Sequence, residues 1–199
     1  MKNAILIHGK PGKDEYYDST FPSASNFHWF PWLQKQLVIV GTPTQTPEMF
    51  MAWQPDYRIW SKELEHYEIT PETILVGHSC GGGFIVQWLS EHKDIHVDKV
   101  VLVAPWLGPI GNNETDDEPI GGFFKFDIDP KLVDRVGSIT IFNSDNDAES
   151  IHSAVNRIRK AIPSVQYKEF HNHGHFCGSD LGKDEFPELL EVITKEAAQ

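Results

Sequence analysis

The sequence predicts an α/β fold in which a mainly parallel sheet of about six strands is covered by helices on both faces. Three observations indicate this fold class. Short apolar runs alternate with longer segments of helical period, two of the runs are apolar without alternation, and Pro or Gly marks many of the joins. Strands buried on both faces lose the polar–apolar alternation of exposed strands. No internal repeat or linker divides the chain, so one domain over residues 1–199 is expected.

Each expected strand is a short run of apolar and β-branched residues. In chain order, the runs are Ala4–Ile7, Leu37–Val40, Thr73–Val76, Lys99–Val103, Ser138–Phe142 and Val165–Phe170. Ile74–Val76 and Val100–Val103 are apolar throughout, which favours the buried centre of the sheet for the third and fourth runs.

The segments between and after these runs have the period of amphipathic helices. They are Trp29–Gln36, Tyr57–Glu65, Gly81–His92, Ile151–Ala161 and Phe186–Lys195. In the first segment, Trp29, Phe30, Trp32 and Leu33 are spaced to form one buried face, so most of them are expected in the core. The stretch Gly108–Asp129 lacks a clear period, and a loop of this length inside a domain is usually functional, such as a lid or a binding loop.

Composition and charge narrow the classes of function. The 199 residues are 40% hydrophobic and 23% charged, which is typical of a globular protein. Lys and Arg total 17 against 29 Asp and Glu, and the net charge of −12 repels phosphate backbones and anionic lipid headgroups. Nucleic acid and membranes are therefore not expected as partners, and the sequence does not indicate a protein partner.

Cysteine content and the N-terminus bear on the compartment. Cys80 and Cys177 are expected as reduced thiols, since disulfide scaffolds use more cysteines in shorter chains. The apolar run Ala4–Ile7 is too short for a signal peptide, and no run approaches the roughly 20 apolar residues of a membrane-spanning helix. A cytoplasmic protein is therefore expected.

The most specific motif is Gly77-His78-Ser79-Cys80-Gly81, a G-x-S-x-G pentapeptide. It follows the expected strand ending at Val76 and opens the next helix, which is the strand–turn–helix context of a nucleophilic serine. The helix start offers backbone N–H groups to developing negative charge. We predict Ser79 as the nucleophile and the N–H of Cys80 as an oxyanion donor. The alternative, a glycine-rich phosphate cradle, lacks the G-x-G-x-x-G pattern near the first strand.

A serine hydroxyl needs a base to hold its proton, and three histidines follow the last expected strand. His175 is favoured because Gly174 permits a tight loop and Phe176 can anchor that loop in the core, whereas His171 and His173 are interpreted as loop residues. These histidines alternate with one another and with Cys177, which also suits a zinc site. Neither an H-E-x-x-H pattern nor a C-x-x-C pair accompanies them, so no metal and no cofactor is predicted.

An orienting acid is expected between the serine and the histidine in chain order. The segment Asn143-Ser144-Asp145-Asn146-Asp147 follows the expected strand that ends at Phe142. An ordinary Asx turn explains either aspartate. The residues alone leave the choice between Asp145 and Asp147 open.

Taken together, these motifs resemble a known family, the small serine hydrolases related to retinoblastoma-binding protein 9 and the bacterial YdeN-like proteins. The resemblance covers nearly the whole chain and rests on His8-Gly9, Asn26-Phe27-His28-Trp29-Phe30-Pro31-Trp32-Leu33, the Ser79 pentapeptide, Asp147 and Gly174-His175-Phe176. It implies a single-domain α/β-hydrolase fold with no large cap domain and a catalytic triad of Ser79, Asp147 and His175. It also implies that the N–H of Lys10 completes the oxyanion hole. The segment Asp14–Ser25 is longer than the family pattern.

The activity that follows is hydrolysis of a small acyl substrate through an acyl-Ser79 intermediate. A carboxylic ester is expected, with an amide, thioester or lactone as the other options. Trp106, Leu107, Phe123 and Phe124 follow a strand's carboxyl end and are expected to wall the acyl pocket. The alternative from another class is a catalytically idle binding protein on the same fold, interacting through Gly108–Asp129.

Overall fold

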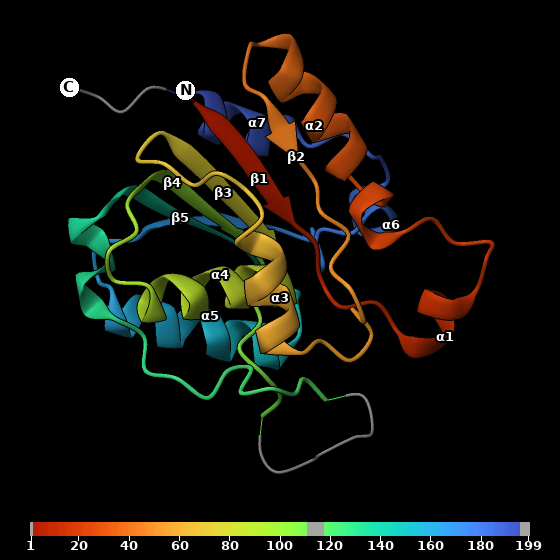
Figure 1. Ribbon diagram of the computed structural model, residues 1–199. Coiled ribbons are helices and arrows are strands. Elements are labelled where there is room, and N and C mark those ends of the chain that lie inside the picture. The colour runs from red at the N-terminus through yellow and green to blue at the C-terminus, as the bar shows by residue number, and fades with distance from the viewer. Residues whose placement is uncertain (1, 111–117, 196–199) are drawn as a thin grey trace.

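Six strands form one parallel sheet, in agreement with the predicted fold class (Figure 1). The computed structural model describes residues 2–110 and 118–195. The strand order is β2-β1-β3-β4-β5-β6, and every neighbouring pair is parallel. The strands are β1 (Asn3–Ile7), β2 (Thr44–Gln45), β3 (Thr73–His78), β4 (Val97–Val103), β5 (Val136–Ser144) and β6 (Gln166–Phe170).

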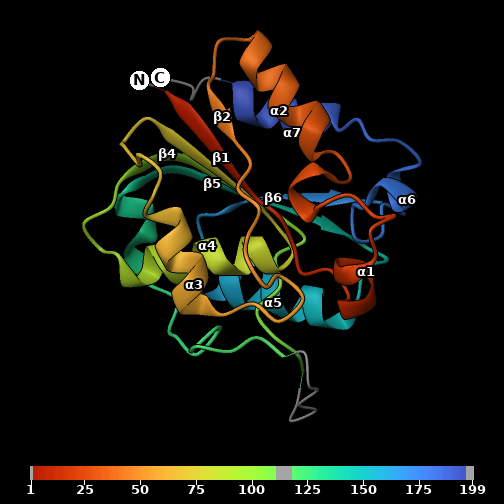
Figure 2. The same cartoon turned by 45° about the vertical axis from the view of Figure 1, so that its right-hand side comes forward.

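Helices lie on both faces of this sheet (Figures 1 and 2). Helices α3, α4 and α5 cover one face, and α2 packs beside α7 on the other. The longer helices are α2 (Phe30–Ile39), α3 (Tyr57–Leu64), α4 (Cys80–Glu91), α5 (Glu149–Ala161) and α7 (Pro187–Thr194). The short ones are α1 (Lys13–Tyr17), η1 (Ala24–Asn26), η2 (Pro130–Asp134) and α6 (Gly178–Leu181). In the described ranges, no helix combines the length and the apolarity needed to cross a bilayer.

The unit of β3 and α4 lies in the centre of the core. All six residues of β3 are buried, and α4 is buried from Cys80 to Ser90. A helix with apolar residues on all of its faces is stable only when it is buried on all sides. Phe84 of α4 therefore packs against Trp60 of α3, with ring centroids 5.6 Å apart. Full burial of a side chain of this size contributes about 1.5–3 kcal/mol, so the turn between β3 and α4 is held on a rigid base.

The predicted strand at Leu37–Val40 is wrong. Leu37 belongs to α2, and the second strand is Thr44–Gln45. Helix α2 turns Phe30, Leu33 and Leu37 toward the core, a spacing of one helical face. The β-branched residues after Leu37 are left on the surface with 51%, 63% and 57% of their area exposed. Their β propensity is therefore overridden by the helix that precedes them.

Of the predicted loop 108–129, residues 111–117 lie outside the described residues. Its second half is attached to the core. Ile120 forms an isolated bridge with Asp56, and Phe123 packs edge-on against Trp60 with ring centroids 5.3 Å apart. The interpretation of the loop as a lid stays a prediction.

Candidate active site

Ser79 occupies a strained turn between β3 and α4. Its φ of 52° and ψ of −120° lie in a region that costs a non-glycine residue about 1–3 kcal/mol. Three hydrogen bonds hold it there: its N–H donates to the Val103 carbonyl at 2.9 Å, and its carbonyl accepts from Trp106 at 2.9 Å and Gly83 at 3.1 Å. The turn also needs glycine, because a Cβ at Gly81 would lie 2.4 Å from the carbonyl oxygen of Ile7. Packing of β1 against the turn thus fixes where Ser79 stands.

The loops after β5 and β6 bring a carboxylate and an imidazole together. Nδ1 of His175 lies 2.9 Å from Oδ2 and 3.1 Å from Oδ1 of Asp147. The Asp147 side chain is 4% exposed and that of His175 is 32% exposed. The same carboxylate accepts the N–H of Ala148 at 2.7 Å. One edge of the imidazole is therefore fixed by a buried acid, while the ring remains open to a cavity beside Ser79.

The other predicted candidates pair elsewhere. Oδ2 of Asp145 lies 2.7 Å from Nδ1 of His171, and Oδ1 accepts the N–H of Asn172 at 2.9 Å. These hydrogen bonds lower the pKa of the Asp145 carboxyl, whose side chain is 41% exposed. Nδ1 of His173 donates to the carbonyl of His171 at 2.8 Å. Of the two aspartates and three histidines, the structure brings together Asp147 and His175 next to Ser79.

Two residues that sequence reasoning did not assign hold the His175 loop. Oδ2 of Asp180, in α6, accepts the backbone N–H of His175 at 2.9 Å and that of Cys177 at 3.1 Å. Burial lowers the pKa of His78 well below its ordinary value, so its neutral ring donates Nε2–H to the His175 carbonyl at 2.8 Å. His78 directly precedes Ser79 in the pentapeptide, and this position could have indicated from the sequence that His78 has a role in the site.

The predicted oxyanion donors flank Ser79 on two elements. Cys80 is the first residue of α4, where a backbone N–H has no acceptor within its own helix and lies at the positive end of the helix dipole. Lys10 follows the His8-Gly9 peptide at the end of β1 and lines the cavities that border Ser79. The structure thus puts both donors at the carboxyl edge of the sheet, where sites in open α/β sheets lie.

The imidazole of His8 fixes the peptide that carries the Lys10 N–H. Met49 donates its N–H to Nε2 of His8 at 2.8 Å. Burial lowers the pKa of His8, so the neutral ring carries its proton on Nδ1 and donates to the Gly9 carbonyl at 2.7 Å. Because the peptide is planar and trans, the Lys10 N–H points away from that carbonyl. His8 thereby sets the direction of the Lys10 N–H.

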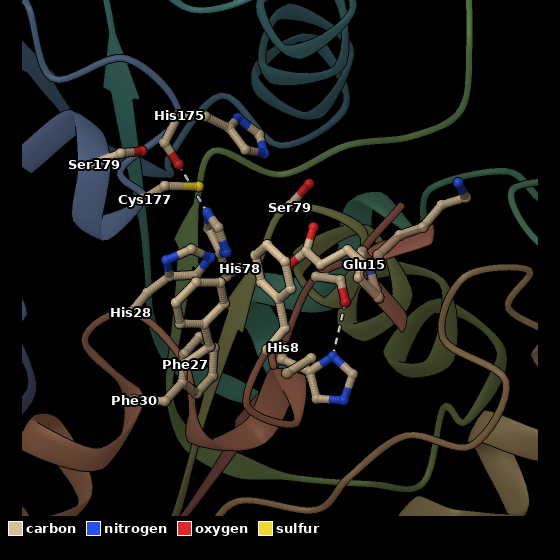
Figure 3. Close-up of a pocket in the computed structure, with 15 residues that line it drawn as sticks. His8, Glu15, Phe27, His28, Phe30, His78, Ser79, His175, Cys177 and Ser179 are labelled. Carbon is tan, nitrogen blue, oxygen red and sulfur yellow. Dashed lines mark hydrogen bonds between the residues drawn. The ribbon is translucent and has the colours of Figure 1, made fainter. Parts of the chain in front are cut away.

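Two cavities meet at Ser79 and His175. The first, of about 450 Å³, is called the aromatic cavity; its walls include Phe21, Phe27, His28 and Phe30, together with Glu15 (Figure 3). The second, of about 430 Å³, is called the Trp106 cavity; it is lined by Trp106, Asp147 and Ile151 among others. A substrate attacked by Ser79 therefore has room on both sides of the attacked atom.

Of the four residues predicted to wall the acyl pocket, one lines a cavity at Ser79. Trp106 lines the Trp106 cavity, whereas Leu107, Phe123 and Phe124 line neither of the two cavities. Phe123 is 4% exposed in the core and Leu107 is 7% exposed, while Phe124 packs edge-on behind Trp106 at 5.4 Å between ring centroids. Instead, Phe21 and Phe27 in the long segment after β1 help to wall the aromatic cavity. The unusual length of Asp14–Ser25 was the signal that could have pointed to Phe21, and Phe27 belongs to the family marker.

The alternating His171, His173, His175 and Cys177 do not converge. Nδ1 of His171 pairs with Asp145, that of His173 with a backbone carbonyl and that of His175 with Asp147, while Cys177 lines the aromatic cavity. Within residues 2–110 and 118–195, no group of three or more His, Cys, Asp or Glu side chains is arranged to hold a metal ion.

Comparisons with known proteins agree with this geometry. The family model described as serine hydrolase matches residues 20–195. YdeN of Bacillus subtilis (strain 168), whose name places it among hydrolases, is 27% identical over 197 residues, or 97% of this chain and 95% of YdeN. The crystal structure of the ydeN gene product from B. subtilis has a TM-score of 0.77 at 23% identity, covering 98% of this chain and 97% of its own.

Two further solved structures share the fold. Est1E from Butyrivibrio proteoclasticus with bound ferulic acid has a TM-score of 0.63 at 16% identity, covering 98% of this chain and 90% of Est1E. Carboxylesterase CesB (YbfK) from Bacillus subtilis has a TM-score of 0.62 at 13% identity, covering 98% of this chain and 85% of CesB. At these identities the likeness concerns the fold alone.

Proposed function

The chain belongs to the serine hydrolase family, and from this premise we propose that it cleaves small carboxylic esters through an acyl intermediate on Ser79. The observation that carries the proposal is the pairing of His175 Nδ1 with the buried Asp147 carboxylate at 2.9 Å, beside a serine held in a strained turn. An imidazole whose Nδ1–H is held by a carboxylate keeps Nε2 free to accept a proton. Such a ring is suited to act as a general base.

The first half of the reaction forms the acyl-enzyme. Ser79 Oγ attacks the ester carbonyl carbon while Nε2 of His175 takes the hydroxyl proton. The carbonyl oxygen becomes an oxyanion, which accepts hydrogen bonds from the N–H groups of Cys80 and Lys10. When the tetrahedral intermediate collapses, the C–O bond to the alcohol breaks and the imidazolium returns its proton to the leaving alkoxide. The alcohol departs and the acyl group remains on Ser79.

The second half releases the acid. A water molecule gives its proton to His175 and attacks the acyl carbon, and collapse of this intermediate returns the proton to Ser79 Oγ. Asp147 keeps the imidazole in the required tautomer and stabilises the imidazolium in both halves. In the described structure the His175 ring is hydrogen-bonded to Asp147 alone, and the contact between a base and its serine commonly tightens when substrate binds. The reaction needs no cofactor.

Ester substrates are favoured by the site and by its neighbours. The two cavities of about 450 and 430 Å³ give separate room to an acyl and an alcohol group. A carboxylesterase, and an Est1E structure with bound ferulic acid, share the fold. Partners are accordingly small acyl compounds rather than nucleic acid or membranes, because the net charge is −12. Amides, thioesters and lactones remain the second choice.

Labelling with a fluorophosphonate, followed by intact-mass measurement, tests the proposal. The wild-type protein should gain one phosphonyl group, and the Ser79→Ala variant should gain none. His175→Ala should label far more slowly and lose roughly 10⁴-fold in ester turnover without unfolding, since members of a triad act as a unit. Failure of the folded wild-type protein to label would instead favour the catalytically idle binding protein.

A further inference from the structure

The aromatic cavity contains an acid whose purpose the proposed reaction leaves unexplained. Glu15, on α1, lines the cavity together with Ser79, and Figure 3 shows its side chain pointing into the space beside Ser79. In residues 2–110 and 118–195, no hydrogen bond or ion pair engages the Glu15 carboxylate. Burial chiefly raises the pKa of Cys177, which lines the same cavity, and the negative charges of Asp180, Asp147 and Glu15 add to this effect.

Three phenylalanine rings share the wall of the cavity with Glu15, beside smaller residues such as Pro11 and Ala24. Phe21 packs edge-on against Phe27 with ring centroids 6.2 Å apart, and Phe27 stacks on His28 at 4.1 Å. Phe30 also lines the cavity, is 1% exposed and has one ring face stacked on Trp29 at 4.2 Å. The faces of aromatic rings carry negative electrostatic potential and attract cations within about 6 Å. A carboxylate among aromatic rings is therefore a suitable environment for an organic ammonium group.

Three histidines of the cavity do not cancel this charge. Burial lowers the pKa of His8, His28 and His78 below the ordinary histidine value, so these rings are neutral at pH 7. The Lys10 ammonium also belongs to a residue of the wall, and Lys10 already has an interaction partner. The surface as a whole has a net charge of −12, which draws cations toward the site.

We propose that the aromatic cavity binds the cationic end of the substrate, with Glu15 as its counter-charge and the phenylalanine rings as its walls. The inference rests on the proposed esterase function and specifies its substrate class: esters that carry an ammonium group, tertiary or quaternary, on the portion entering this cavity. Glu15 acts in recognition and takes no part in the chemical step. It should therefore affect the choice between substrates and leave neutral esters alone.

Calorimetric titration tests the site without requiring turnover. Benzyltrimethylammonium is titrated into the full-length wild-type protein, Glu15→Gln and Asp14→Asn. Asp14 is the neighbouring exposed residue of α1 and lines neither cavity, so Asp14→Asn removes the same unit of net charge away from the site. Wild type and Asp14→Asn should bind equally, and Glu15→Gln about tenfold more weakly, which corresponds to about 1.4 kcal/mol. Equal affinities in all three proteins, or no binding to wild type, would overturn the proposal.

Substrate kinetics connect the site with catalysis. In one pair of esters, the p-nitrophenyl ester of γ-trimethylammoniobutyric acid is compared with its carbon isostere, in which tert-butyl replaces trimethylammonium. In the other pair, butyrylcholine is compared with its carbon isostere. In one of the two pairs, the group that differs enters the aromatic cavity. For that pair, the wild-type protein should have a higher kcat/KM for the cationic ester than for its neutral isostere. Glu15→Gln should reduce the ratio of these two kcat/KM values about tenfold. The neutral ester should be cleaved equally by both proteins.

The outcomes separate this inference from the proposed function. If neutral esters are cleaved and the ratio is unchanged by Glu15→Gln in both pairs, the cation site is refuted and the esterase stands. If no ester is cleaved and no fluorophosphonate is bound, while calorimetry still shows Glu15-dependent cation binding, the esterase is refuted and the cation site stands. Circular dichroism of each variant confirms that it is folded.

Discussion

Replacement of Asp147 by Asn should remove most ester turnover, while the same change at Asp145 should leave it near normal. The Asp147 carboxylate accepts from both Ala148 N–H and His175 Nδ1. Its side chain is 4% exposed, so water does not take its place beside the imidazole. An asparagine has one acceptor oxygen and one donor amide. With the amide toward His175, the imidazole proton moves to Nε2 and the ring can no longer act as a base.

The loss can be worked out from these contacts. With the amide oxygen toward His175, the opposite charge beside the imidazolium is lost, which costs about 1–3 pKa units, or about 10- to 1000-fold. With the amide N–H₂ toward His175, the wrong tautomer of the imidazole costs about 10⁴-fold. We therefore expect a loss of about 10³- to 10⁴-fold in kcat. The fold should survive, because the shape of the side chain is kept.

The assay is hydrolysis of p-nitrophenyl butanoate by wild type, Asp147→Asn and Asp145→Asn, with circular dichroism as a control of folding. Asp145 is the matched control because its hydrogen-bond partners, His171 and Asn172, are exposed and lie away from the cavities. Its variant should stay within a few-fold of wild type. Near-normal turnover of Asp147→Asn together with collapse of Asp145→Asn would refute the reasoning and reverse the assignment.

Three further predictions concern residues around Ser79. His8→Asn keeps a donor at the δ position for the Gly9 carbonyl and should retain kcat within about tenfold of wild type. His8→Gln moves the amide one carbon further and should lose about 10²-fold in kcat with KM unchanged. Equal kcat values in the two variants would disprove the positioning role. Gly81→Ala places a Cβ 2.4 Å from a β1 carbonyl oxygen and should lower Tm by about 5–10 °C. The control is Gly12→Ala, whose Cβ meets nothing within 4 Å and which should change Tm little. Scanning calorimetry of each variant measures both values. Burial raises the pKa of Cys177 to about 12, so its thiolate forms only as pH approaches that value. Alkylation of Cys177 by iodoacetamide at pH 8 should therefore be slow in the native protein and fast in guanidinium. Rapid alkylation of the native protein would contradict the effect of burial.

Long, strongly patterned elements were predictable from the sequence, and short ones were not. The runs at Thr73–Val76 and Lys99–Val103 appear as β3 and β4 because full burial demands an apolar run whatever the context. Leu37–Val40 failed because an apolar, β-branched run at the end of a helix looks the same in sequence as a strand. The true second strand, Thr44–Gln45, has two polar residues and carries no periodic signal.

The site was predictable where chemistry dictates residue type and order. Ser79 is recognisable from its glycines and its place between strand and helix. The choice of Asp147 over Asp145 depends on how two loops meet, which is tertiary information. The residues alone left this choice open, and the family resemblance selected Asp147. The aromatic cavity depends on the path of Asp14–Ser25, which is irregular apart from α1 and η1. Phe27 was therefore assigned only as part of a family marker, and Glu15 was not assigned at all.

The two edge strands of the sheet, β2 and β6, affect how the protein behaves in concentrated solution. Strand β2, at one margin, is two residues long and is bracketed by Pro43 and Pro47, which have no N–H to offer an incoming strand. At the other margin, β6 carries Lys168 and Glu169 among its five residues. Edge strands that are short, flanked by proline or charged prevent the sheets of separate molecules from pairing edge to edge. Aggregation by strand addition should therefore begin only after one of these two edge strands has unfolded.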